Sequence, residues 1–322
     1  MVIILSKSTD LHALAVKHEV EKLNTSCEII DTAAYPHRTG LENIFDSTTN
    51  SRGILYLERN KSISCVDVIG VWRRRIYNHI LSEELSETYK EVSRKDTRTA
   101  LDGFFFTLSS LPVTVINNPL HETPALNKTY QLRIAQKNGL LIPGTLITNN
   151  QDSLTCFFRE KTRENKKVIY KAFNSPSDAV ITTTLMTNDD LQRLETLQYG
   201  PAIFQEYIEG RNLRVTYVCG NIFAAEVLIS TDEAARDWRL ELNNKVIPYE
   251  LSEKNKEQIS RLMTALKLEY GAIDFKLSNA GELFFLEVNP WGQYLFVEIQ
   301  TGLPISKSIA ESLIRKSVTT YG

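Results

Sequence analysis

The amino-acid sequence predicts a mixed α/β fold divided into several sub-domains. Short apolar runs typical of β-strands alternate along the chain with segments whose apolar residues recur at helical spacing. The chain has 322 residues, which is long for one compact domain. Hydrophobic residues make up 42% of it and charged residues 24%, so it can bury a sizeable core.

Residues 1–120 are expected to form a small N-terminal α/β domain. Val2–Leu5 is an apolar run of strand length, and residues 11–23 follow with apolar side chains at helical spacing. A long helix is predicted at about 82–111, where a charged first half leads into an apolar end. Further strands are predicted at 27–30, within 62–72 and at 113–117.

Residues 121–200 are expected to form a central sub-domain and residues 201–322 a C-terminal one. The central part contains predicted helices at 128–138 and 188–197 and a predicted strand at 168–173. The C-terminal part is richer in strand signals. Its strands are predicted at 202–207, 214–219, 222–229, 272–277 and 283–288, and its helices at 254–268 and 305–318.

Charge and cysteine content exclude several classes of protein. The 37 Lys and Arg against 39 Asp and Glu give a net charge of −2, which argues against binding to nucleic acid through bulk positive charge. No apolar stretch approaches the length of a membrane span, and the start of the chain does not read as a signal peptide. The four cysteines are far apart in the sequence, so a reducing cytoplasm is expected. The charge balance and the short apolar runs favour a protein with neither a nucleic-acid nor a membrane partner.

The strongest chemical signal is Asp274 together with Glu287 and Asn289. Glu287 and Asn289 are two positions apart on one predicted strand, so their side chains leave the same face. Asp274 lies on the preceding strand and joins them if the hairpin loop has two or four residues. A three-residue loop would turn it away. Two carboxylates and an amide oxygen amid apolar neighbours predict a magnesium site, which usually also takes phosphate and water ligands.

Several more residues complete a pattern around this trio. Lys128, Lys171, the segment 205–208 and Arg214 precede it in the order and at the spacing found in ATP-grasp ligases, and about the last 200 residues resemble that family. The likeness extends to the graspetide, or microviridin-type, peptide macrocyclases over nearly the whole chain. The segments that carry it are 71–75, 127–128, 143–145, 237–239 and 292–295. This resemblance implies an ATP-grasp fold with an N-terminal pre-ATP-grasp domain.

The resemblance also implies roles for individual residues. The residues that it assigns to ATP are Lys128, Lys171, Glu206, Tyr207, Ile208 and Asn212. Of these, the two lysines would hold phosphates. Residues 206–208, the linker of the family, would contact adenine. Asn212 stands where many relatives have an acidic residue. Arg214 and Arg239 would stabilise the reaction centre, since a guanidinium spans two oxygens. The trio would hold two Mg²⁺ ions. Each lysine could instead be solvated, and each arginine could form a surface salt bridge.

The function that the resemblance implies is ATP-dependent crosslinking of a ribosomal precursor peptide. An Asp or Glu side chain would be activated as an acyl phosphate and joined to a hydroxyl or an amine, giving an ω-ester or an ω-amide. The peptide would be recognised through its leader, and a homodimer is compatible with the family. Arg73, Arg74 and Arg75 are either exposed to solvent at the end of a strand or help hold an acidic peptide. The alternatives are a ligase that adds a free amino acid and a nucleotide-binding module without catalysis.

Overall fold

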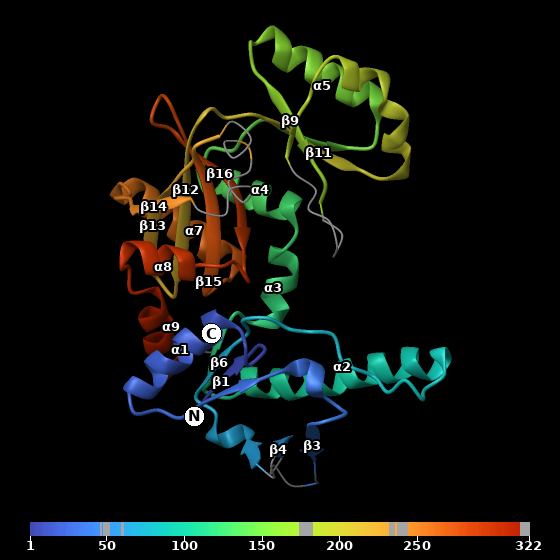
Figure 1. The fold of residues 1–322 in the computed structure, drawn as a ribbon, viewed down its shortest axis with the longest axis vertical. Helices are drawn as coiled ribbons and strands as arrows, with labels where there is room; N and C mark the ends of the chain where they lie inside the picture. The colour runs from blue at the N-terminus through green and yellow to red at the C-terminus, as the bar shows by residue number, and fades with distance from the viewer. Residues whose placement is uncertain are drawn as a thin grey trace.

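The computed structural model describes residues 1–45, 47, 52–58, 61–173, 183–231, 236 and 244–315. In this part of the chain the strands form four sheets. Figure 1 shows them in three tiers, with the N-terminal domain at the bottom, a five-stranded sheet in the middle and a small four-stranded unit at the top. The mixed α/β class is therefore confirmed.

The N-terminal domain is built on a parallel sheet in the order β2-β1-β6-β7. Helix α1 (Leu11–Lys22) begins at Asp10, whose side chain accepts a hydrogen bond from the backbone of His12 and so caps the helix. Helix α2 (Glu87–Ser110) begins at Ser86, somewhat later than predicted. The strands are β1 (Val2–Leu5), β2 (Cys27–Ile30), β6 (Gly70–Trp72) and β7 (Thr114–Ile116).

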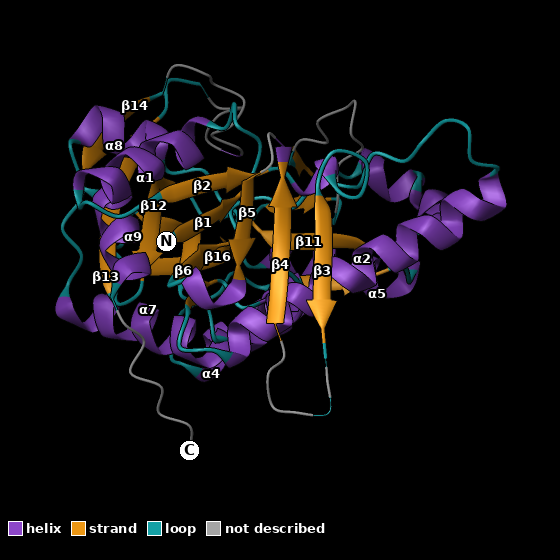
Figure 2. Cartoon of the chain, turned by 90° about the horizontal axis from the view of Figure 1, so that it is seen from below, coloured by secondary structure: helices purple, strands orange, loops and turns teal. Residues whose placement is uncertain are grey.

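A second, antiparallel sheet in this domain was not predicted. It contains β3 (Gly40–Ile44), β4 (Arg52–Leu57) and β5 (Lys61–Ser64). The predicted strand within 62–72 is thus two strands in different sheets. Seen from below, β3 and β4 run side by side next to α2 (Figure 2). Their burial is incomplete, so their apolar pattern in the sequence is weak.

The central unit contains an antiparallel sheet in the order β10-β9-β11-β8. Strand β11 (Ala202–Glu206) lies beyond the boundary expected at residue 200, yet it pairs with β8 and β9 of this sheet. Helix α4 (Lys128–Lys137) is confirmed, whereas α5 (Gln151–Arg163) was missed. The other elements are α3 (Pro119–Ala125), β8 (Thr145–Thr148), β9 (Val168–Lys171) and β10 (Thr184–Leu185).

The α-helix predicted at 188–197 is wrong. The chain there forms two 3₁₀ segments, η4 (Asp189–Gln192) and η5 (Leu194–Tyr199). Asn188 makes no side-chain capping bond, whereas the Asp190 carboxylate accepts hydrogen bonds from the Thr187 backbone and hydroxyl at 2.7 and 2.8 Å. Asp190 therefore stabilises a tight local turn instead of the first turn of an α-helix.

The C-terminal sheet has the order β14-β13-β12-β15-β16 and is antiparallel throughout. One face is covered by α4 and by α7 (Glu253–Leu266) over an apolar core. The other face packs in part against α8 (Leu295–Thr301) and α9 (Ile305–Ile314) and is otherwise polar. The strands are β12 (Gly210–Val218), β13 (Asn221–Leu228), β14 (Lys245–Pro248), β15 (Tyr270–Ser278) and β16 (Leu283–Asn289).

One apolar cluster joins the N-terminal domain to the C-terminal sheet. The Trp72 ring meets the edge of the Tyr270 ring at 6.1 Å, and both lie against Tyr294. The buried side chain of Asn117 bonds the backbone of Glu269 and both the N–H and the carbonyl of Tyr270. Because this contact is buried and hydrogen-bonded on both sides, the two parts are held in a defined orientation.

Gly70 tests how tightly this junction is packed. A Cβ atom at Gly70 would lie 2.3 Å from the backbone oxygen of Leu313 on α9. Gly70→Ala should therefore push strand and helix apart and lower the free energy of unfolding by about 2 kcal/mol. Gly103→Ala, in open space on α2, should instead stabilise by about 1 kcal/mol. Urea denaturation of both variants measures this, and equal effects would contradict the packing.

Candidate active site

The register of the β15–β16 hairpin decides where Asp274 points. Leu277 pairs with Leu283 and Phe275 with Phe285. If this register continued, Asp274 would pair with Leu286 and lie on the face away from Glu287. The loop includes Gly281 with a positive φ of 82°. A β-bulge between Asp274 and Phe275 then shifts the register, and Asp274 pairs directly with Glu287. The bulge thus restores the alignment that the loop alone would remove.

The three predicted metal ligands share the polar face of the hairpin. Asp274 lies opposite Glu287, and Ala272 lies opposite Asn289, so the trio is on one side. Their neighbours on the other face belong to the apolar core. The Asn289 side-chain oxygen accepts a hydrogen bond from the Trp291 backbone at 2.9 Å, so it already helps shape the following loop.

Each carboxylate of the trio lies beside a cation. Arg214 Nη1 donates to Asp274 Oδ1 at 2.8 Å, and Lys128 Nζ lies 3.0 Å from Glu287 Oε2. Arg214 is buried on β12, the strand that pairs with β15 at this position. Lys128 begins α4, so a helix and a sheet converge on the same point. These pairs offset charge that would otherwise be partly desolvated.

A pocket at this point gathers most of the predicted residues. The predicted residues that line it are Lys128, Lys171, Asn212, Asp274 and Glu287. Thr183, Arg236 and Lys276 line it as well. Four cations thus face two carboxylates in one pocket, a balance that favours a polyanion over a free metal ion. Among the described residues, no group of three or more His, Cys, Asp or Glu is placed to hold a metal; the predicted trio has two carboxylates and an amide.

Asn212 supplies an independent sign that the pocket takes a ligand. Its side-chain nitrogen is buried and has no hydrogen-bond partner within the described part of the chain. A buried hydrogen-bond donor without an acceptor costs free energy, so such a group commonly bonds a ligand or a water molecule. The hydroxyl and phosphate oxygens of a nucleotide are acceptors of the required kind.

Lys276 is a site residue that the sequence reasoning missed. It is 4% exposed, lies two positions after Asp274 on the same face, and its burial lowers its pKa to about 8. Its ammonium is 5.8 Å from the centre of the Tyr207 ring. The signal was present in the sequence, because a lysine within an apolar strand at period-two spacing from Asp274 shares its face.

The predicted adenine linker connects β11 to β12. The N–H of Glu206 donates to the Gly144 carbonyl at 2.7 Å, and that of Tyr207 donates to the Lys167 carbonyl at 2.8 Å. Ile208 is buried, and the Glu206 side chain pairs with Lys166. Glu206, Tyr207 and Ile208 are not among the residues that line the pocket above, although Tyr207 reaches its wall through Lys276.

The loop after β16 holds Arg214 in place. Arg214 Nη2 donates to the Gln293 carbonyl at 2.8 Å, while its other nitrogen bonds Asp274. Gly292 lies against this guanidinium, since a Cβ there would be 3.0 Å from Nη2 and 2.2 Å from the Ala272 Cβ. Arg239, the other predicted reaction-centre cation, lies outside the described residues.

Comparison with known proteins agrees with this geometry. Residues 1–122 match the family model described as the MvdD pre-ATP grasp domain. Residues 127–292, more than half of the chain, match the model of the ATP-grasp domain. The chain belongs to the ATP-grasp family. No curated protein matches it.

Solved ATP-grasp structures resemble the chain from end to end. The macrocyclase MdnC of Microcystis aeruginosa MRC, bound to its precursor peptide MdnA, is 30% identical with a TM-score of 0.83, covering 98% of this chain and 99% of that one. A Chryseobacterium gregarium RiPP-associated ATP-grasp ligase, in complex with ADP and a leader and core peptide, is 29% identical with a TM-score of 0.87, covering 97% and 96%. The macrocyclase MdnB of Microcystis aeruginosa MRC is 30% identical with a TM-score of 0.80, covering 100% and 99%.

Glu287 tests the metal assignment. Glu287→Gln keeps the shape of the side chain but removes a charge from the proposed Mg²⁺ site, so ATP turnover should fall at least about a hundredfold. Binding of Mn²⁺, followed by electron paramagnetic resonance, should weaken in parallel, while the melting temperature stays close to wild type. Glu282→Gln, exposed in the same hairpin, is the matched control. Unchanged turnover in Glu287→Gln would reject the assignment.

Gly292 tests whether Arg214 must be held in position. Gly292→Ala would drive its new methyl group into Ala272 and the Arg214 guanidinium. Turnover should fall about a hundredfold because misplacing a charged group at the reaction centre is costly. ADP affinity, measured by calorimetry, should change much less. Gly200→Ala, with no atom within 4 Å of its added Cβ, should leave both unchanged. Equal activity of the two variants would show that the loop has no such role.

Proposed function

We propose that this protein is an ATP-dependent, ADP-forming ligase that crosslinks side chains within a ribosomally made precursor peptide. The observation that carries the proposal is the pocket in which Asp274 and Glu287, aligned by the bulge, face Lys128, Lys171 and Asn212. A phosphate-binding set of cations beside metal-type ligands suits phosphoryl transfer. The full-length likeness to MdnC and to the Chryseobacterium ligase supports a peptide substrate.

ATP and Mg²⁺ fit the residues present. The orphaned Asn212 amide and the cations around the pocket suit a nucleotide, and the Chryseobacterium relative was solved with ADP. Asp274, Glu287 and Asn289 offer the oxygen donors that Mg²⁺ prefers, and we propose two ions there. When bound, Mg²⁺ neutralises charge on the phosphates.

The proposed roles of the side chains follow from their places. Lys128 and Lys171, which both line the pocket, hold phosphate oxygens, and Asn212 donates to the ribose. The linker residues Glu206, Tyr207 and Ile208 contact adenine. Arg214, fixed between Asp274 and Gln293, stabilises negative charge on the reacting acyl group, and Arg239 is assigned the same task.

A free carboxylate reacts poorly with nucleophiles, and the proposed chemistry first activates it by phosphorylation. An oxygen of a substrate Asp or Glu side chain attacks the γ-phosphorus of ATP, the bond to the β-phosphate oxygen breaks, and ADP leaves. A hydroxyl or amine of the same peptide then attacks the acyl carbon. Its proton is released, inorganic phosphate departs, and an ester or amide remains. The protein contributes alignment and fixed positive charge to both steps.

We further propose that the protein acts in the cytoplasm, without a nucleic-acid or membrane partner, and as a homodimer. Cys27, Cys65, Cys156 and Cys219 are all unpaired, which suits a reducing compartment. None of the helices in the described ranges is long and apolar enough to cross a bilayer. The dimer rests on the family resemblance alone.

Mass spectrometry tests the proposed reaction. The enzyme with Mg²⁺, ATP and synthetic peptides rich in Thr, Lys, Glu and Asp should remove one water per crosslink and release one ADP for each. A ligase that adds a free amino acid would instead raise the peptide mass by an amino-acid residue. Persistence of ATP with every peptide would favour a binding module and reject the proposal.

A further inference from the structure

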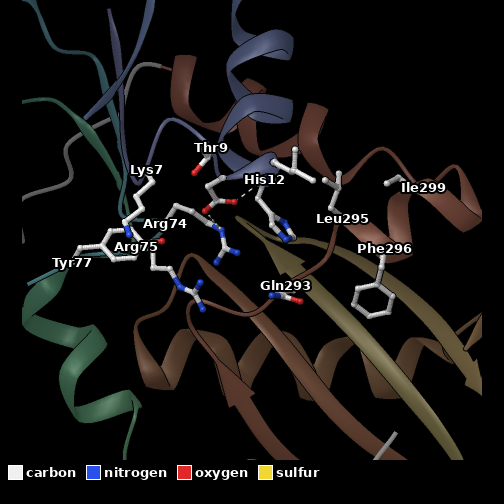
Figure 3. Close-up of a pocket in the computed structure, with 12 residues that line it drawn as sticks. Lys7, Thr9, His12, Arg74, Arg75, Tyr77, Gln293, Leu295, Phe296 and Ile299 are labelled. Atoms are coloured by element: carbon white, nitrogen blue, oxygen red, sulfur yellow. Dashed lines mark hydrogen bonds and ion pairs between the residues drawn. The ribbon is translucent and has the colours of Figure 1, made fainter. Parts of the chain in front are cut away.

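A second pocket lies where the N-terminal domain meets the loop after β16 (Figure 3). It encloses about 500 Å³. Its walls come from the segment after β1, the start of α1, the segment after β6, and residues 293–299.

One wall of this pocket is cationic. Lys7, Arg74 and Arg75 contribute three positive charges against the single carboxylate of Asp10. Figure 3 shows these cations on the same side of the pocket. His12 adds no charge at neutral pH, because burial and the nearby Arg74 lower its pKa to about 4. The pocket therefore carries an excess of positive charge that suits an anion.

Arg74 shows that this wall is built into the fold and is not a solvated strand end. Its side chain is 2% exposed, donates from Nη1 to the Trp291 carbonyl, and has Nε 3.4 Å from Asp10 Oδ2. Arg74 Nε and His12 Nδ1 are nevertheless buried without a hydrogen-bond partner among the described residues. Lys7 and Arg75 are exposed at the pocket and accessible to a ligand.

The opposite wall is apolar. Leu11 is 67% exposed and Ile299 is 75% exposed, and both line the pocket with Phe296. Figure 3 places Phe296 and Ile299 across the pocket from Arg75. A ligand that carries a carboxylate next to an apolar side chain would satisfy both walls at once.

The pocket adjoins the reaction centre through one residue. Gln293 lines the pocket, and its carbonyl accepts the hydrogen bond from Arg214 Nη2. Arg214 in turn holds Asp274. Gln293 therefore joins the lining of this pocket to the arginine proposed for the reaction centre.

We propose that this pocket binds an acidic side chain of the peptide substrate, at a residue other than the one being activated, with an apolar neighbour against Phe296 and Ile299. Lys7 and Arg75 bind the carboxylate at the entrance, and Arg74 supplies fixed charge behind them. The inference rests on the proposed function for its peptide, and it explains how one carboxylate is anchored while another reacts.

Binding of small probes tests the pocket without a full peptide. The acetylated dipeptide amide Ac-Glu-Phe-NH₂ and its Gln counterpart are titrated by NMR into the whole protein. The Glu probe should bind at least about tenfold more tightly than the Gln probe, since only it carries charge. Lys7→Met with Arg75→Gln should remove that preference. Lys22→Met, whose side chain is 57% exposed at the end of α1, should keep it.

The results separate the pocket from the proposed function. Equal affinity for the two probes, or a preference that survives in the double variant, would overturn the pocket. With a peptide that the wild type crosslinks, the double variant should raise KM about tenfold and change kcat little. An unchanged KM would overturn the role in substrate binding. A wild type that prefers the Glu probe but crosslinks no peptide would reject the proposed function and not the carboxylate site.

Discussion

The direct pairing of Asp274 with Glu287 is the constraint on which the site depends. A β-bulge between Asp274 and Phe275 shifts the pairing register of the two strands by one residue, and both carboxylates therefore leave the sheet on one face. Arg214 on β12 and Lys128 at the start of α4 then meet these carboxylates from two directions. Without the bulge, one carboxylate would enter the apolar core, where an unpaired charge is costly.

The loop after β16 connects this site to the rest of the molecule. Three successive carbonyls in it accept hydrogen bonds from different elements: that of Trp291 from Arg74, that of Gly292 from the Tyr270 hydroxyl, and that of Gln293 from Arg214. The N-terminal domain therefore helps position Arg214, the arginine proposed for the reaction centre, in the C-terminal sheet. The same loop contributes Gln293 to the lining of the cationic pocket.

The helices and strands were predictable where buried apolar residues recur at the spacing of one face of the helix or strand. The C-terminal strands and α7 were recovered because their apolar residues follow a clear period and end at turn signals. The β3–β5 sheet escaped because its strands are only partly buried. The helix predicted at 188–197 failed because the Asp190 side chain bonds backward to Thr187, a contact that propensity does not reveal.

The sequence by itself determined which chemical groups this protein brings to its site, since strand periodicity places Glu287 and Asn289 on one face and residue order indicates the family. Tertiary structure alone decided three further points. The bulge realigned Asp274, packing buried Asn212 in the pocket, and the domain junction turned Arg73 and Arg74 inward while leaving Arg75 exposed. These outcomes depend on pairing between segments distant in the chain, which no local pattern encodes.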